Sequence, residues 1–76
     1  METKRTVTFV DRLETQDYKY EVSEIPRVGE HVTIFDNPKS AKILLQGTVI
    51  RVRWVYIDSE RDLIPEPTIV LDAPPV

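Results

Sequence analysis

Two stretches of this sequence constrain the fold more than any others: a Pro/Gly corner that leads into a short strand, and a glycine followed by a long β-branched run. The first is Ile25–Ile34, where Pro26 fixes its own φ and Gly29 can take a positive φ at the corner. The second starts at Gly47 and runs through valine, isoleucine and arginine to Trp54. Together they predict a small, strongly bent antiparallel sheet, with a bulge or sharp bend at Gly47.

Segments with the β-branched, aromatic or alternating character of strands follow one another along the chain. They are residues 6–10, 18–23, 31–35, 43–57 and 68–71. No stretch has helical periodicity longer than a turn, so the sequence predicts an all-β fold of about five strands. An open sheet this short leaves unpaired edges, which partial closure removes. We therefore expect a partly open SH3-like barrel over residues 1–72 and a flexible Pro-rich tail at 73–76.

The expected core takes the apolar side chains from one face of each strand. In the long strand, Ile50 through Tyr56 alternate, so that the even-numbered side chains share one face and Arg51, Arg53 and Val55 share the other. The predicted core consists of Val7, Phe9, Tyr20, Val22, Val28, Val32, Ile34, Leu44, Ile50, Val52, Trp54, Ile69 and Leu71.

Composition excludes several functional classes. The chain has 76 residues, no cysteine and a net charge of −3, which excludes disulfides and thiolate zinc sites and disfavours a general polyanion binder. Residues 31–57 carry four Lys/Arg against one Asp, whereas residues 58–76 carry five Asp/Glu against one Arg. We see neither a signal peptide nor a run long enough to cross a bilayer, and therefore expect a cytoplasmic protein of a bacterial or infected host cell.

The sequence has no recognisable catalytic arrangement. His31 is the only histidine, and a single histidine needs converging carboxylates to hold a metal. Asp58, Glu60 and Asp62 alternate as in a calcium loop, but the required mid-loop glycine and the later bidentate glutamate are missing. No glycine-rich phosphate loop precedes a helix. We therefore expect no enzyme activity, no cofactor and no metal.

Candidate binding residues lie on the basic part of the chain. Arg51 and Arg53 are two apart on a strand, so both guanidinium forks project from one face and match phosphates or carboxylates. An outward Phe35 beside them would stack a base or anchor a protein contact. The alternative is ordinary ion pairing, with Phe35 covering an open barrel end. The candidate set is Arg51, Arg53, Phe35, His31, Lys39 and Lys42. Trp54 and Tyr56 have an alternative reading as an aromatic peptide groove.

A resemblance to known proteins involves the same corner. Pro26-Arg27-Val28-Gly29-Glu30, followed by alternating Val32 and Ile34 and then by Gly47–Val52, resembles a pattern of short bacterial and phage proteins of unassigned function. It is also loosely similar to the KOW type of SH3-like barrel in ribosomal and transcription proteins, although Asp36–Lys39 replaces the loop glycines of that type. The resemblance covers about residues 25–72 and implies the fold, which does not itself carry a function.

From these observations we expect a non-enzymatic protein-binding module, a small adaptor or a phage-type inhibitor, that occupies a surface of a larger protein. Exposed edge strands invite pairing with another chain, either a partner or a second copy in a homodimer, and Thr68–Leu71 or the first strand would serve as the edge. The alternative is a nucleic-acid-binding domain that uses the basic face of 31–57. A third hypothesis is an accessory domain that completes a partner enzyme's site. We expect no membrane partner.

Overall fold

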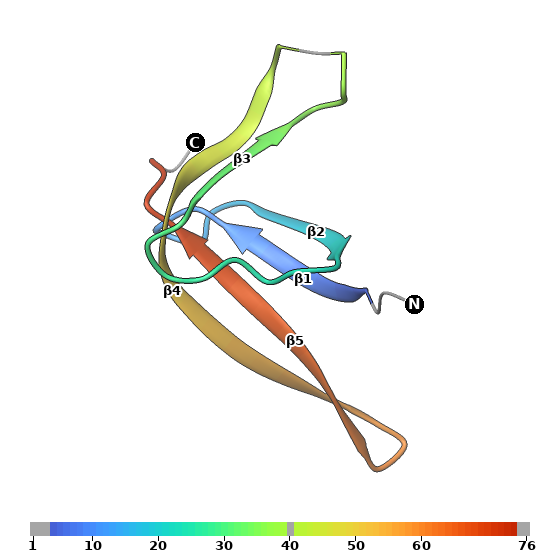
Figure 1. Cartoon of the computed structure of the whole chain (residues 1–76). Coiled ribbons are helices and arrows are strands. Elements are labelled where there is room, and N and C mark those ends of the chain that lie inside the picture. Colours follow the sequence, from blue (N-terminus) through green and yellow to red (C-terminus); the bar gives the residue numbers. More distant parts are fainter. Residues whose placement is uncertain (1–3, 40, 75–76) are drawn as a thin grey trace.

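The computed structural model describes residues 4–39 and 41–74 (Figure 1). These residues form five strands and no helix: β1 (Arg5–Val10), β2 (Asp17–Val22), β3 (His31–Phe35), β4 (Ile43–Ser59) and β5 (Asp62–Leu71). The strands make one sheet in the order β2-β1-β5-β4-β3, which curls into a half-barrel. The all-β class and the partly open barrel predicted from the sequence are confirmed.

The sheet is mixed because its first and last strands run in the same direction. β1 pairs with β2, β3 with β4 and β4 with β5 in antiparallel fashion, but Thr8–Val10 of β1 lies parallel to Thr68–Val70 of β5. The linker 23–30 crosses the open side of the half-barrel and joins the β1–β2 hairpin to the other three strands (Figure 1). This crossing places β1 and β5 in the middle of the sheet. The prediction that Thr68–Leu71 or the first strand forms an edge is therefore wrong.

The core is centred on the three middle strands. Its buried apolar cluster is Val7, Phe9, Leu45, Val49, Ile69, Leu71 and Ala73. Four predicted core residues are in this cluster, and Val22, Val32, Ile34 and Val52 pack against it with partial burial. Tyr20, Val28, Ile50 and Trp54 are exposed, which corrects the prediction for these positions.

A bulge in β4 explains why Ile50 is exposed and why Leu44, also predicted to be in the core, is only partly buried. Val49 pairs with Leu71 and Arg51 with Val70, so Ile50 is the extra residue. Before the bulge the odd-numbered side chains of β4 face the core, and after it the even-numbered ones do. Leu45 is consequently buried in place of the partly buried Leu44, and Ile50 is exposed.

Gly47, where the sequence predicted the bulge, has a different role. It lies in regular register opposite Val32. A Cβ added to Gly47 would lie 2.7 Å from the carbonyl oxygen of Asp72. The residue therefore permits a close approach between β4 and the segment after β5. That segment is part of the fold, since Ala73 is 2% exposed and the ordered domain extends past the predicted boundary at residue 72. Residues 75 and 76 of the predicted tail lie outside the described residues.

The β1–β2 turn is organised by a buried carboxylate. Asp11 has no exposed surface and accepts hydrogen bonds from the backbone amides of Leu13, Thr15 and Gln16 at 3.0, 2.9 and 3.2 Å. Its other contact is the Thr15 hydroxyl, which donates to Oδ2. These bonds, that of the hydroxyl foremost, lower the pKa of Asp11. The sequence has no Asn-Gly pair at this turn, and the hydrogen bonds of Asp11 hold it instead, with Glu14 at a φ of 56°.

Candidate binding surfaces

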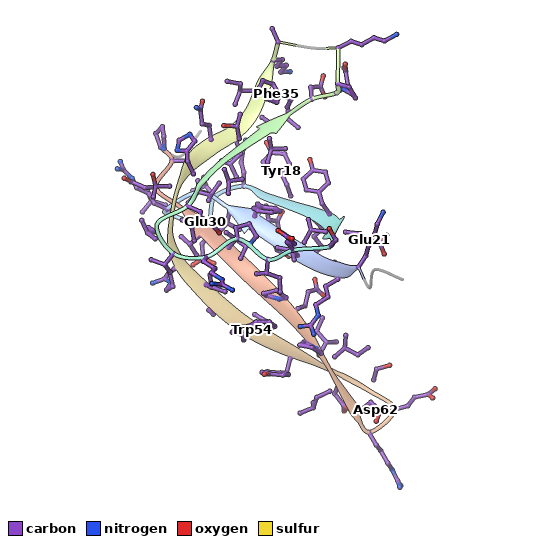
Figure 2. All side chains as sticks on the ribbon, viewed as in Figure 1. Tyr18, Glu21, Glu30, Phe35, Trp54 and Asp62 are labelled. Carbon is purple, nitrogen blue, oxygen red and sulfur yellow. The ribbon has the colours of Figure 1, made fainter. Side chains whose placement is uncertain are left out.

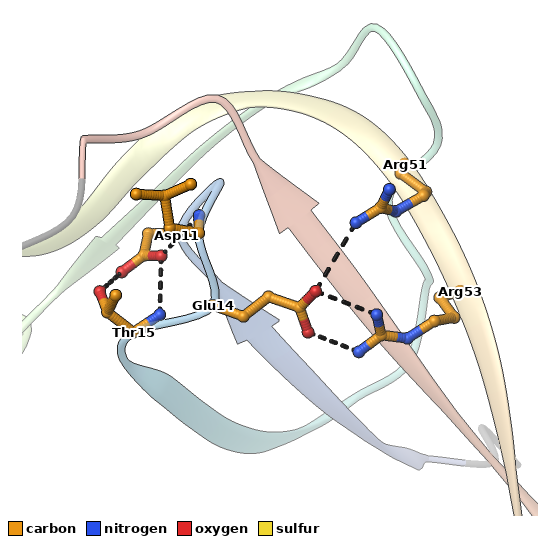
Figure 3. Close-up of polar contacts among 6 residues, drawn as sticks. Asp11, Glu14, Thr15, Arg51 and Arg53 are labelled. Carbon is orange, nitrogen blue, oxygen red and sulfur yellow. Dashed lines mark hydrogen bonds and ion pairs between the residues drawn. The ribbon is translucent and has the colours of Figure 1, made fainter.

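The two arginines that the sequence singled out share one face of β4, as predicted, and both contact Glu14 (Figure 3). Arg53 donates to the two carboxylate oxygens of Glu14 at 3.0 and 2.5 Å, and Arg51 lies 3.6 Å from the same group. The fork of Arg53 lowers the pKa of Glu14 and the carboxylate raises the pKa of Arg53. On this outer face both arginines therefore have an ionic partner within the chain, Glu14, as the ion-pair alternative predicted.

The other candidate residues lie elsewhere on the molecule. Nε2 of His31 is 3.2 Å from Nε2 of Gln46 on the neighbouring strand. Phe35 is 51% exposed and lies near the β3–β4 tip, at the end of the sheet away from the β4–β5 hairpin (Figures 1 and 2). At that tip the amide of Lys39 donates to Asn37 Oδ1 at 2.9 Å, and the carbonyl of Lys42 accepts from the amide of Asp36 at 3.0 Å. The structure therefore does not gather the six residues into one patch.

A groove opens between the linker and the concave face of the sheet, and of its residues only Trp54 was indicated by the sequence. Its volume is about 1020 Å³. Linker residues 23–28 and Glu30 form one wall, and Arg5, Val52 and Trp54 form the other. The walls are apolar at Ile25, Pro26, Val28, Val52 and Trp54, and they carry charges of both signs. This combination suits an extended peptide with both apolar and charged side chains.

The Pro/Gly corner builds the linker wall. Gly29 has a φ of 96°, and its amide donates to the carbonyl of Val49 at 2.9 Å. The amide of Val49 donates back to the carbonyl of Glu30 at 2.8 Å, and the side chain of Glu30 accepts from the amide of Arg27 at 2.6 Å. These bonds attach one end of the linker to β4. The segment of the sequence that most constrained the fold thus also forms the groove.

Trp54 is the aromatic side chain of the groove and remains 44% exposed. The guanidinium carbon of Arg5 lies 5.9 Å from the centre of its ring, within the range of a cation–π contact. The contact holds one side of the indole and leaves surface available to a ligand. For Trp54 the aromatic-groove reading agrees with the structure better than core membership does. Tyr56 lies farther along β4 and does not line the groove.

The distal parts of β4 and β5 form a two-stranded arm, residues 55–66, whose outer part projects beyond the rest of the sheet (Figure 1). Large apolar side chains are exposed on both of its faces: Val55, Tyr56, Ile57, Leu63 and Ile64. The alternating acidic residues Asp58, Glu60 and Asp62 do not form a long loop. Ser59 pairs with Asp62, so the turn itself consists of Glu60 and Arg61.

Two further findings bear on function. In the described part of the chain, no group of three or more His, Cys, Asp or Glu side chains is placed to hold a metal ion. No helix able to span a membrane occurs within residues 4–39 or 41–74.

Comparison of the chain with protein-family models, with curated proteins and with solved structures finds no match. The likeness of the corner Pro26–Glu30 to bacterial and phage proteins therefore stays a prediction.

Proposed function

We propose that this protein is a non-enzymatic protein-binding module that receives an extended segment of a larger protein in the groove between linker 23–30 and β4. The observation that carries the proposal is the half-exposed Trp54, held by Arg5 at the side of a groove of about 1020 Å³. Tryptophan in a concave site surrounded by other apolar groups is the typical anchor of a protein interface. In this role the protein acts in the cytoplasm as a small adaptor or a phage-type inhibitor.

The chemistry of the groove favours a particular kind of segment. Ile25, Pro26 and Val28 offer apolar surface opposite the indole of Trp54, so an aliphatic or proline side chain of the partner fits between them. Glu24 and Glu30 lie in the groove together with Arg5 and Arg27, so side chains of either charge can be paired next to that apolar anchor. An extended segment with both apolar and charged side chains is therefore the expected ligand.

Nucleic-acid binding through the basic stretch 31–57 has weaker support. Arg53 already makes a two-point contact with Glu14, and Arg51 lies beside the same carboxylate. A phosphate would have to displace this pair before it could use either arginine. The other residues of that hypothesis, Lys39 and Lys42 for phosphates and Phe35 for base stacking, lie at the β3–β4 tip (Figure 2).

The test is an affinity pull-down from native lysate with and without nuclease, with recovered proteins identified by mass spectrometry. We expect one protein in stoichiometric amount that resists nuclease and is lost with Trp54→Ala. Leu13→Ala, which removes an exposed apolar side chain that does not line the groove, is the matched control and retains the partner. Recovery that disappears with nuclease supports nucleic-acid binding instead, and a partner retained by Trp54→Ala contradicts the groove assignment.

A further inference from the structure

The distal half of β4 has an open edge. β3 pairs with β4 as far as Thr48, and the linker bonds to Val49. From Arg51 to Ser59, among the described residues, β4 pairs with β5 alone. The side of β4 that faces away from β5 is therefore a row of backbone donors and acceptors available to another strand (Figure 1). We call Arg51–Ser59 the open edge.

The prolines of β5 determine which residues of β4 face the open edge. Pro65 lies opposite Tyr56 and Pro67 opposite Trp54. Because proline has no N–H, these are the pairs of the ladder that exchange no hydrogen bonds. The backbone groups of Trp54 and Tyr56 therefore point away from β5, and by alternation those of Val52 and Asp58 do the same.

The same prolines close the other side of the arm. β1 pairs with β5 over Thr68–Val70. Just before this pairing Pro67 is fully buried and Glu66 lies 3.2 Å from Lys19 of β2, so residues 62–65 of β5 extend past the neighbouring strands. Along this outer side neither Pro65 nor the buried Pro67 supplies a donor, which is a common way to prevent strand addition. The open edge of β4 contains no proline and no lysine. Of the two sides of the arm, β4 alone is suited to receive a strand.

We propose that the occupant of this edge is a second copy of the chain, paired antiparallel to form a homodimer with one continuous sheet. With a twofold axis at Val55, Trp54 lies opposite Tyr56 of the other copy and Val52 lies opposite its Asp58. The backbone groups of all four residues point away from β5, so these pairs can exchange hydrogen bonds between the two copies. The axis also brings together exposed apolar side chains on both faces, Trp54 and Tyr56 on one and Val55 and Ile57 on the other.

The charges of the arm favour this arrangement. At the base of the arm two arginines share a single carboxylate, Glu14, which leaves a net positive charge. The tip carries Asp58, Glu60 and Asp62 against Arg61 and is net negative. Antiparallel pairing puts the acidic tip of each copy beside the basic base of the other, whereas parallel pairing would put like charges together. The uneven charge of the sequence thus becomes a self-complementary surface.

A single cysteine tests the register directly, since the chain has none of its own. On the proposed axis, residue 55 of one copy lies opposite itself in a pair without hydrogen bonds, where Cα atoms are about 4.5 Å apart, close enough for a disulfide. We expect Val55→Cys to form a covalent dimer rapidly in mild oxidant. Ile64→Cys, also at an exposed position but on β5, is the control and stays reduced. Equal cross-linking of the two variants overturns the proposal.

Sedimentation velocity tests the backbone pairing. The wild type should sediment at twice the monomer mass of 8.8 kDa, with the dimer fraction falling on dilution and at high salt. Tyr56→Pro removes a donor that faces the open edge and leaves the ladder with β5 intact, so it should be monomeric with an unchanged circular dichroism spectrum. Tyr56→Thr keeps the donor and should weaken the dimer without abolishing it. A wild-type monomer at high protein concentration contradicts the proposal.

The two proposals can fail separately. Loss of the dimer in Tyr56→Pro with partner recovery retained leaves the groove assignment in place, because Tyr56 does not line the groove. Loss of the partner in Trp54→Ala leaves the backbone of the open edge unchanged.

Discussion

At the scale of single residues, a buried carboxylate has the clearest effect on stability. Asp11 binds three backbone amides and one hydroxyl of a turn that has no glycine or asparagine of its own. Without the carboxylate, these donors would be left without their acceptor. Because the turn also presents Glu14 to Arg51 and Arg53, Asp11 supports the outer ion cluster as well as the hairpin (Figure 3).

The first prediction concerns acid stability. The pKa of Asp11 in the folded protein lies below its ordinary value of 3.8. A group with a lowered folded pKa stabilises the fold above its unfolded pKa, and this contribution is lost as the pH falls through the folded pKa. We expect Asp11→Asn to reduce the free energy of unfolding strongly at neutral pH and progressively less below pH 3.8. Urea denaturation of both proteins across pH measures this, and a difference that persists unchanged in acid would argue against it.

The second prediction separates the roles of the two glycines. Gly47→Ala places a methyl group 2.7 Å from a backbone oxygen and should cost about 1–3 kcal/mol. Gly29→Ala meets nothing within 4 Å, but its φ of 96° should cost about 1–2 kcal/mol. Asparagine tolerates positive φ, so Gly29→Asn should recover part of the loss while Gly47→Asn should worsen it. If asparagine has the same effect at both positions, the distinction is incorrect.

Residue patterns in the sequence determined which side chains share a face, but not what lies opposite them. Alternation correctly put Arg51 and Arg53 together. Their partner Glu14 lies 39 residues from Arg53 in a turn, and no local pattern connects the two. The signal for Trp54 was similarly ambiguous, because a strand residue on the core side is buried only if another element covers it.

At the scale of elements, the turn of the arm is strained. Glu60 and Arg61 have φ values of 49° and 76°, the positive pair that a two-residue hairpin needs and that Asn-Gly adopts best. We predict that Glu60→Asn with Arg61→Gly raises the free energy of unfolding by about 1–2 kcal/mol. Denaturation of the double variant tests the gain. As a control, Asp58→Asn, made within the ladder, should have little effect on stability, and equal gains in both variants would rule out the turn as the cause.

Strand positions were predictable from the sequence, and their irregularities were not. The five predicted segments correspond to β1–β5. β5 begins earlier than expected because Pro65 and Pro67 occupy positions where the backbone N–H would point away from β4. The ladder between β4 and β5 therefore loses no hydrogen bond, and the strand tolerates both prolines. The bulge lies at Ile50, which no sequence signal marks, since glycine favours but does not require a bulge. One misplaced residue was enough to assign the wrong face at Leu44 and Ile50.

At the scale of the whole molecule, a partner bound at the outer face of the sheet and a partner bound in the groove would respond differently to the same substitutions. If the groove binds the partner, Arg51→Glu with Arg53→Glu should leave its recovery in a pull-down within about twofold of wild type, since exposed ion pairs contribute little. Glu14→Gln is the control for loss of the same ion pairs without charge reversal. Loss of the partner in the double variant, with an unchanged circular dichroism spectrum, would instead support the sequence-based hypothesis that the arginines form the binding surface.

The overall topology was the part least accessible from sequence. Periodicity identifies strands and their inward faces, but the order of strands depends on contacts between distant segments. The parallel pairing of Thr8–Val10 with Thr68–Val70 is one such contact. The groove also depends on topology, because it exists only where the linker crosses the sheet. Fold class was therefore predictable, and the sites that depend on strand order were not.

The parallel pairing of β1 with β5 also has a consequence for biosynthesis. β1 and β2 leave the ribosome early, yet the central strand beside β1 and the core residues Ile69, Leu71 and Ala73 follow about sixty residues later. Until then the emerging chain exposes Val7 and Phe9, and the backbone N–H and C=O groups along the free edge of β1 have no partner strand. Nascent chains in such a state tend to associate wrongly. A nascent chain stalled before residue 68 should remain protease-sensitive, and release of the segment through Ala73 should complete the fold in one cooperative step.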